Sequence, residues 1–271
     1  MDKRTAAEVR EHYEIEKQIA ERLRSSSAEE RKNLYTEAYD ELFRRVPHHP
    51  LINNYAPAEK EKQIAKEVRS LQSFINKDTI YLEIGPGDCA LAFEIALQVK
   101  KVYAIDVSNE ITKNTDAPAN FELIISDGSD IPVAPGSVDV AFSNQLMEHL
   151  HPDDSFAQLK NVFRALKTGG VYFCITPNRL SGPHDVSRNF DAVAAGLHLK
   201  EYTVTELDAL FRKAGFSETR IYTGVSNIFL PVLPFKIAEK LLDILPHSMR
   251  KLLTFNKIVR FLLGVKLVGT K

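Results

Sequence analysis

The stretch that decides the fold is Tyr81-Leu82-Glu83-Ile84-Gly85-Pro86-Gly87-Asp88-Cys89-Ala90-Leu91. It predicts a short apolar strand, a tight turn with two glycines and the start of a helix. Glycines at 85 and 87 permit positive φ angles and let a ligand approach the backbone closely. The helix N-terminus that follows offers unpaired N–H groups to an acceptor. The segment therefore predicts a ligand-binding loop at the end of the first strand of an α/β sheet.

From about residue 79 onward, apolar strand-like runs alternate with helical stretches. This alternation is typical of βαβ units and a mostly parallel sheet, so we expect an α/β fold. The glycines of segment 167–170 predict a helix end and a turn into the fifth strand. The predicted strands are 80–84, 102–105, 121–125, 138–142, 171–175, 219–222 and 264–269, and the predicted helices between them include 90–99, 155–166 and 203–214.

Two regions of different composition flank this α/β unit. Residues 1–75 are dense in charge and carry apolar residues at helical spacing, which predicts two or three helices packed on a larger body. Serines 25–27 followed by two glutamates predict a break and a new helix start. Residues 226–262 hold six basic and two acidic side chains, a net charge of +4, among many apolar ones. Their prolines favour a folded lid, with a membrane-surface element as the alternative.

Composition excludes several classes of protein. The 271 residues are 44% apolar and 26% charged with a net charge of −1, which argues against a basic field for nucleic acid. The only cysteines, Cys89 and Cys174, exclude a disulfide framework and favour a reducing compartment. No apolar leader opens the sequence and no run reaches 18 apolar residues. We therefore expect a cytoplasmic protein without a transmembrane segment.

Two acidic positions after the next strands predict a pocket for an adenosine group. Asp106 lies 21 residues past Gly85, at the end of the second predicted strand and next to Val107. A carboxylate there can accept hydrogen bonds from both hydroxyls of a ribose. The third predicted strand, 121–125, is followed by Ser126-Asp127-Gly128, where the Asp127 carboxylate could accept a hydrogen bond from the exocyclic amine of adenine.

The glycine spacing alone leaves the identity of the ligand open. Gly85-x-Gly87-x-x-Ala90 also satisfies the relaxed dinucleotide fingerprint, so a nicotinamide cofactor is an alternative. Glu83, two residues before the first glycine, argues against a nicotinamide cofactor. An acidic side chain there suits a cationic amino-acid group and is a poor neighbour for a pyrophosphate.

With these residues in place, the chain resembles class I S-adenosylmethionine-dependent methyltransferases, in the broad group of small-molecule and quinone-biosynthesis enzymes. Glu83-x-Gly85-x-Gly87 matches the first motif of that family, Asp106 its ribose acid and Asp127-Gly128 its adenine contact. The segment 144–150, with Asn144 and Gln145, matches the motif beside the transferred methyl group. The resemblance covers about 76–223 and the final strand. Cys89 is a departure, because the family usually has a third glycine at this position.

The resemblance implies S-adenosyl-L-methionine as the cofactor and a Rossmann-like, seven-stranded sheet. The last strand of that sheet is antiparallel and lies between the fifth and sixth. Residues 1–75 would form a helical N-terminal cap and residues 76–271 the cofactor-binding domain. Within that domain, 226–262 would be a helical lid inserted between strands six and seven, at the edge of the substrate mouth.

Two histidines are candidate catalytic bases. His149 follows the fourth strand, where a neutral imidazole could deprotonate an acceptor hydroxyl, although it could instead hold the start of a helix in place. His184 lies in the long polar loop after strand five with Asp185 and Arg188, and His198 is a further base candidate. Some quinone methyltransferases carry a metal-linked E-x-x-E-H pattern here. Gln145 replaces its first acid, so we predict no metal.

The sequence thus predicts methyl transfer from S-adenosylmethionine to a small-molecule acceptor, with oxygen as the expected atom. The apolar-rich 226–262 stretch favours a partly hydrophobic acceptor and leaves peripheral membrane contact open. No nucleic-acid partner is expected, because Ser143-Asn144-Gln145-Leu146 lacks the prolines of base-N methyltransferases. Two alternatives remain, a nicotinamide-dependent oxidoreductase and a non-catalytic methyltransferase-like binding protein. The acceptor itself and the oligomeric state are left open.

Overall fold

The computed structural model describes residues 4–50, 57–108, 116–224 and 228–271. Its strands lie within a few residues of the predicted ones, because each apolar run is bounded by turn residues. They are β1 (Ile80–Ile84), β2 (Lys101–Asp106), β3 (Phe121–Ile125), β4 (Val138–Asn144), β5 (Leu166–Thr176), β6 (Glu218–Tyr222), β7 (Phe229–Pro231) and β8 (Val265–Thr270). The predicted turn at 167–170 lies inside β5, where Gly169 has a φ of 78°.

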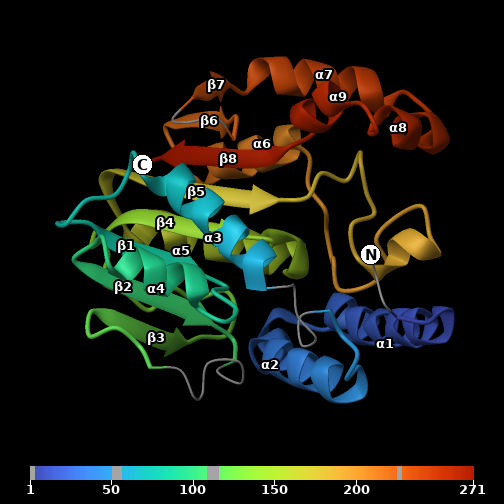
Figure 1. Cartoon of the computed structure of the whole chain (residues 1–271), viewed down its shortest axis with the longest axis horizontal. Coiled ribbons are helices and arrows are strands. Elements are labelled where there is room, and N and C mark those ends of the chain that lie inside the picture. The colour runs from blue at the N-terminus through green and yellow to red at the C-terminus, as the bar shows by residue number, and fades with distance from the viewer. Residues whose placement is uncertain (1–3, 51–56, 109–115, 225–227) are drawn as a thin grey trace.

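The eight strands form one sheet in the order β3-β2-β1-β4-β5-β8-β6-β7 (Figure 1). Strands β1 to β5 pair in parallel, and β8 is antiparallel to both β5 and β6. The predicted position and direction of the last long strand are therefore confirmed. The predicted count of seven is wrong by one strand, the short β7, which pairs antiparallel with β6.

Aromatic packing explains the additional strand at the sheet edge. The ring of Phe229 lies 5.6 Å from that of Tyr222 and 5.4 Å from that of Phe74, so pairing β7 with β6 buries apolar surface. Pro231 ends the strand on the outer edge, where its missing N–H costs no ladder hydrogen bond.

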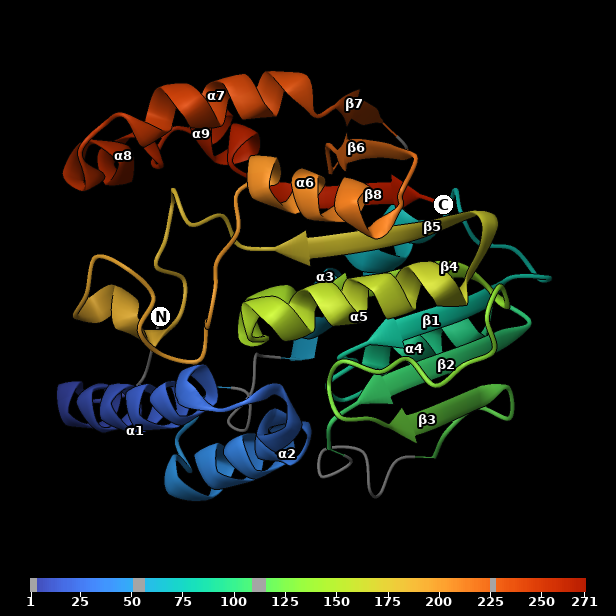
Figure 2. The same cartoon turned by 180° about the vertical axis from the view of Figure 1, so that it is seen from behind.

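Helices cover both faces of the sheet (Figures 1 and 2). On one face, α3 (Pro57–Leu71) and α4 (Ala90–Ala96) pack over alternate residues such as Tyr81 and Val102. On the other face, α5 (Pro152–Ala165) and α6 (Val204–Ala214) pack over Leu82 and Ile84. The alternation follows from the two-residue period of a strand, and it makes both layers apolar.

Two N-terminal helices, α1 (Ala6–Ser25) and α2 (Ala28–Arg45), lie at the carboxyl ends of the parallel strands (Figure 1). We call this pair the cap helices. Ser27 forms a capping box with Glu30, so the predicted break and helix start are confirmed. In contrast to the cap helices, α3 lies on a face of the sheet beside α4.

A buried ion pair fixes the cap helices to the sheet domain. Arg31 of α2 donates to both carboxylate oxygens of Asp154 in α5, at 2.5 and 2.9 Å. The Tyr35 hydroxyl donates to Asp154 at 2.7 Å and accepts from the His151 backbone N–H at 2.8 Å. Because Arg31 and Asp154 are both buried, removing either one would leave an uncompensated charge.

Three short helices lie between β7 and β8, where the sequence predicted an insertion: α7 (Leu233–Asp243), α8 (His247–Leu253) and α9 (Lys257–Leu262). Positions 226 and 227 of that predicted insertion lie outside the described residues. In the described part of the chain, no helix has the length and apolar character needed to cross a bilayer.

The loop after β1 contains an unusual backbone position at Cys89. This residue has a φ of 60° and a ψ of 12°, the left-handed region, and its side chain is fully buried. Left-handed torsions cost an L-residue roughly 1–2 kcal/mol and are worst for β-branched side chains. Cys89 therefore occupies a backbone conformation suited to glycine.

We predict that Cys89→Gly retains more stability than Cys89→Val, although valine fills a buried apolar site better than glycine. Both the left-handed torsions and overpacking would destabilise the valine variant. The difference in unfolding free energy between the two variants should therefore be about 1–2 kcal/mol. Urea denaturation of the two variants measures it. Equal stability, or a more stable valine variant, would show that the torsions of Cys89 carry no strain.

Candidate active site

The glycine loop lies where the chain order of the sheet reverses, since β1 has β2 on one side and β4 on the other. Crevices of this kind, at the carboxyl ends of the strands, are where open α/β sheets bind ligands. Gly85 and Gly87 have φ angles of 68° and 57°. A Cβ built on Gly87 meets no atom within 4 Å, so the loop borders open space there.

A pair of buried carboxylates lies beneath this loop. Burial and the nearby charge of Glu67 raise the pKa of Glu83 well above its ordinary value. Burial also raises the pKa of Glu67, which belongs to α3 and was not predicted as a site residue. Among the residues that the structure describes, neither carboxylate has an ion pair. The pair therefore suits a cationic group supplied by a ligand.

Asp106 is the last residue of β2, and its carboxylate connects the glycine loop to the turn after β2 through hydrogen bonds. Its carboxylate accepts from the backbone N–H groups of Val107 at 2.7 Å and Ser108 at 3.3 Å, and from that of Gly87. Burial raises the pKa of Asp106, and these three hydrogen bonds oppose the rise. The contact with Gly87 places the predicted ribose acid beside the glycine loop, and its contact with ribose stays a prediction.

The predicted adenine end lies after β3, against a cap helix. Asp127 accepts from the backbone N–H groups of Ser129 at 2.9 Å and Asp130 at 2.8 Å. Burial alone would raise the pKa of Asp127, but these hydrogen bonds outweigh it and the pKa is lowered. A Cβ on Gly128 would lie 3.2 Å from the ring of Tyr35, so α2 closes against this turn.

Asn144 is the last residue of β4, and Gln145 follows it in different surroundings. The Asn144 amide donates to Glu67 at 2.7 Å, so it orients the buried carboxylate pair. Gln145 has a φ of 56° and an exposed side chain, and its backbone N–H donates to Ile175 at 2.8 Å. Of the two, Asn144 is tied to the glycine-loop site through Glu67.

His149 lies in the short helix η1 (Met147–His149) directly after β4. Its Nδ1 is 3.1 Å from the carbonyl oxygen of Leu197. A carbonyl only accepts, so Nδ1 carries the proton and Nε2 is left with its lone pair. Burial lowers the pKa of His149 to about 3. The imidazole is therefore neutral near pH 7.

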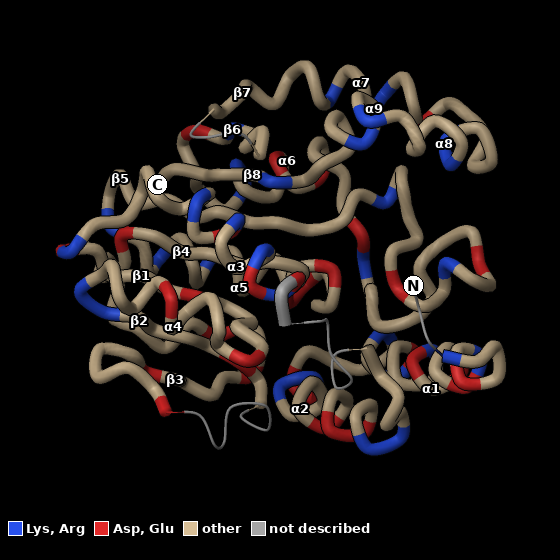
Figure 3. Tube along the Cα trace, in the orientation of Figure 1, with Lys and Arg blue, Asp and Glu red and all other residues tan. Residues whose placement is uncertain are grey.

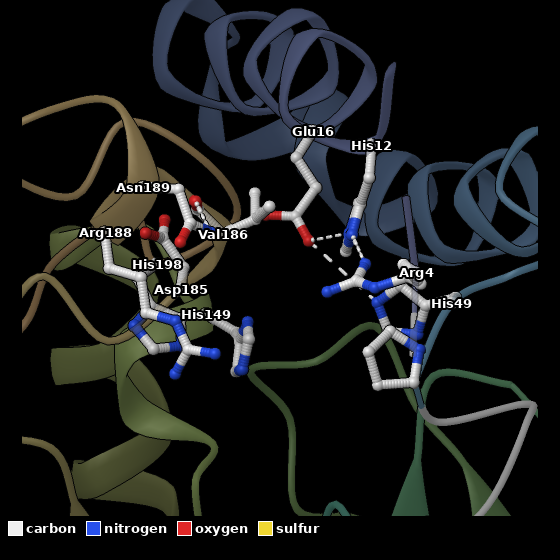
Figure 4. A pocket seen from close by; sticks show the side chains of 11 residues that line it. Arg4, His12, Glu16, His49, His149, Asp185, Val186, Arg188, Asn189 and His198 are labelled. Atoms are coloured by element: carbon white, nitrogen blue, oxygen red, sulfur yellow. Dashed lines mark hydrogen bonds and ion pairs between the residues drawn. The ribbon is translucent and has the colours of Figure 1, made fainter. Parts of the chain in front are cut away.

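His149 lines a cavity of about 200 Å³ between the cap helices and the loop after β5 (Figure 4). We call it the histidine cavity. The His149 and His198 rings lie 4.8 Å apart. The lining residues are Arg4, His12, Glu16, His49, Pro50, His149, Asp185, Val186, Arg188, Asn189 and His198.

The cap contribution to this cavity was not predicted from the sequence. His12 and Glu16 are one turn apart on α1, and their side chains hydrogen-bond at 2.6 Å. The second oxygen of Glu16 accepts from the Leu197 backbone N–H at 3.1 Å. The i, i+4 spacing places both residues on one helix face, but it does not reveal what that face packs against.

His184, the second predicted base, lies elsewhere. Its side chain is exposed, and its Nε2 lies 3.0 Å from the Ser181 hydroxyl and 3.2 Å from the Asn178 carbonyl oxygen. It lines a second cavity of about 390 Å³ together with Gln145 and Lys266. The two predicted bases therefore face different cavities, and His198 is the candidate that the structure brings beside His149.

Three neighbouring side chains, two of which line the histidine cavity, could together hold a cation or a proton. Potential ligand atoms of Glu148, His149 and His198 all lie within 4.8 Å of one another. Glu148 is fully buried, with Oε1 lacking a partner and Oε2 accepting from Thr176 at 2.8 Å. Burial raises the pKa of Glu148 to about 7, so a proton could neutralise it. The predicted absence of a metal stays a prediction.

A second group of this kind comes from the cap side of the cavity. Ligand atoms of His12, Glu16 and His49 also lie within 4.8 Å of one another. Arg4 lies 2.6 Å from Nδ1 of His12 and brings a positive charge to this group. A guanidinium beside the site opposes cation binding, so this group is better suited to an anionic or neutral ligand.

We predict that Glu148→Gln becomes more stable relative to the wild type as the pH rises. In the native state Glu148 keeps its proton up to about pH 7, whereas in the unfolded chain it loses it near 4.5. Wild-type stability therefore falls across that window by about 3 kcal/mol, and glutamine removes the fall. Urea unfolding of both proteins at about pH 5 and 8 measures the trend. A pH-independent difference would contradict a protonated Glu148 and indicate a bound cation.

Comparison with known proteins adds an independent finding. A family model described as "Methyltransferase domain" matches residues 82–174, which run from β1 to β5. A probable S-adenosylmethionine-dependent methyltransferase of Mycolicibacterium smegmatis is 29% identical over 136 residues, 50% of this chain and 51% of that protein. One of Mycobacterium tuberculosis is 28% identical over 136 residues, 50% of this chain and 47% of that protein. The chain thus spans about half the length of the curated relatives it matches.

Solved structures agree on the fold. The methyltransferase complex with the Haloferax volcanii Trm112 methyltransferase activator superposes with a TM-score of 0.53 at 15% identity, over 79% of this chain and 94% of that chain. An O-methyltransferase structure from Nostoc punctiforme gives a TM-score of 0.50 at 13% identity, over 79% and 59% of the two chains. Over residues 82–174 the chain is thus similar to S-adenosylmethionine-dependent methyltransferases, and it shares the fold of solved methyltransferase structures.

Proposed function

We propose that this chain transfers the methyl group of S-adenosylmethionine to a hydroxyl oxygen of a small-molecule acceptor. The observation that carries the proposal is the buried pair Glu83 and Glu67 beneath a glycine loop with open space above it. A cationic amino group would neutralise that pair, whereas the pyrophosphate of a nicotinamide cofactor would meet two carboxylates. This favours the methyltransferase over the oxidoreductase alternative.

The residues at the sheet edge fit the cofactor in order along the strands. Glu83 and Glu67 would hold its amino-acid end, with Asn144 orienting Glu67. Asp106 and Val107 would hold the ribose at the end of β2, and the turn at 127–128 the adenine. When bound, S-adenosylmethionine supplies a methyl group that is already activated. The protein then has to position the acceptor and remove its proton.

We assign the acceptor to the histidine cavity. Its volume of about 200 Å³ suits a small molecule, and nine of its eleven lining residues are polar or charged. His149 Nε2 would take the hydroxyl proton while the oxygen bonds to the methyl carbon and the sulfur–carbon bond breaks, which leaves a thioether. The Nδ1–H bond to Leu197 holds the imidazole in the required tautomer throughout. His184 remains the alternative base for an acceptor in the second cavity.

Helix α1 lines the histidine cavity, and α9 with the end of α8 lines the second cavity. We propose that regions 1–75 and 226–262 act as cap and lid of a 76–271 methyltransferase domain. Both cysteines are free and buried, which supports the proposed cytoplasmic location. A quinone acceptor stays a prediction from the resemblance. A partly hydrophobic acceptor likewise stays a prediction.

We predict micromolar binding of S-adenosylhomocysteine by calorimetric titration, without binding of NAD or NADP. Glu83→Gln should weaken that binding at least 10-fold, because it removes a charge that pairs with the amino group of the ligand. The exposed Glu94→Gln on α4 is the matched control and should bind as the wild type does. Binding of a nicotinamide cofactor, or an unchanged Glu83→Gln, would contradict the assignment.

We predict that His149→Ala lowers kcat by about 10²–10⁴ while the affinity for S-adenosylhomocysteine stays unchanged. The assay is release of S-adenosylhomocysteine during a screen of hydroxyl acceptors. His149 stays neutral above about pH 4, so its protonation should add no loss of rate near pH 6. His184→Ala, at the other cavity, should stay within a few-fold of wild type. If His184→Ala abolishes turnover and His149→Ala does not, the roles are reversed.

A further inference from the structure

Helices α7–α9 expose apolar side chains that the fold itself does not use. On α7 and its last turn, Leu233, Ile237, Leu241 and Ile244 are 53–78% exposed. Their spacing of three and four residues places them along one face of the helix. Exposed apolar side chains gathered in one contiguous region mark a surface that binds something.

The inner face of α7 is already fully occupied. Phe235 is buried and packs on Phe261 of α9 at a ring distance of 5.7 Å. Glu239 is buried and accepts hydrogen bonds from Asn178 and from the backbone of Val204. The helix is therefore docked through its inner face, and the outer apolar row stays mostly exposed.

The next two helices also expose apolar side chains. Leu252 at the end of α8 is 69% exposed, Phe255 between α8 and α9 is 79% exposed, and Ile258 of α9 is 68% exposed. Together with the outer row of α7, they form what we call the α7–α9 surface. Figure 1 shows the three helices gathered along one margin of the molecule, and Figure 3 shows Lys and Arg distributed among them.

The charge of the α7–α9 surface is positive. Lys240, Lys251, Lys257 and Arg260 are exposed, and within the described ranges none of them has an ion pair. The two acids of this region do not pair with these four cations. Glu239 is buried, and Asp243 lies between Arg179 at 3.3 Å and Arg250 at 3.4 Å.

We propose that the α7–α9 surface binds the surface of an anionic lipid bilayer. Apolar side chains such as Phe255 would enter the boundary of the acyl chains, and the four unpaired cations would contact lipid phosphates and acidic headgroups. A symmetric contact between two copies of this chain would instead set the same unpaired cations against one another. Charge complementarity therefore favours an anionic lipid over a second copy.

The test is co-sedimentation of the full chain with vesicles of phosphatidylcholine alone or with about one third phosphatidylglycerol. The proposal expects at least 10-fold stronger binding to the anionic vesicles, weakened when salt rises from about 0.1 to 0.5 M. Lys251→Gln combined with Lys257→Gln should weaken binding roughly 25-fold, at about fivefold per lysine. Leu252→Ser combined with Phe255→Ser should weaken it at least as much.

Leu97→Ser is the matched control, because Leu97 is 65% exposed at the end of α4 and lies outside the α7–α9 surface. This variant should bind vesicles as the wild type does. All substituted side chains are exposed, so unchanged circular dichroism spectra are expected. Affinity for S-adenosylhomocysteine should also be unchanged, which separates a failure of this inference from a failure of the proposed function.

Three outcomes would overturn the proposal. One is the absence of sedimentation with either vesicle, and another is equal binding to neutral and anionic vesicles. The third combines two results. The chain does not bind vesicles, and without lipid it self-associates in sedimentation velocity unless Leu252→Ser and Phe255→Ser are both present. That last result would assign the α7–α9 surface to a contact between copies of this chain.

Discussion

The arrangement of the site follows from one electrostatic constraint, the burial of Glu83 next to Glu67. Two carboxylates removed from water cannot both ionise without a cation, so protons or a ligand must neutralise them. The glycine loop above the pair borders open space, and Asn144 orients Glu67 from the neighbouring strand. The sheet thus holds two buried acids whose desolvation is offset when a proton or a cation neutralises them.

Much of the fold is readable in the sequence, since apolar runs and turn residues locate the seven longer strands and the capping motifs locate the start of α2. The strand β7 is not readable, because it depends on Phe229 packing against Tyr222 and Phe74 across the sheet edge. The same limit applies to the site. Glycine and aspartate positions carry local signals, whereas Glu67 joins the site only through tertiary packing of α3.

The histidine cavity shows this limit most clearly. His149 and His198 come from the sheet domain, but His12, Glu16 and His49 reach the cavity from the N-terminal region. Helical periodicity shows which face of α1 is polar and cannot show what that face meets. The separation of His149 and His184 into two cavities likewise depends on the course of the loop after β5, which has no periodic pattern to read.

The contact between α2 and the turn at Gly128 has a consequence for the timing of the catalytic cycle. Tyr35 packs against that turn and is hydrogen-bonded to Asp154, the partner of Arg31. If the turn holds adenine as proposed, the nucleoside can leave only when this packing loosens, and a buried ion pair resists that motion. Cofactor exchange would then depend on the packing of a cap helix against the sheet domain.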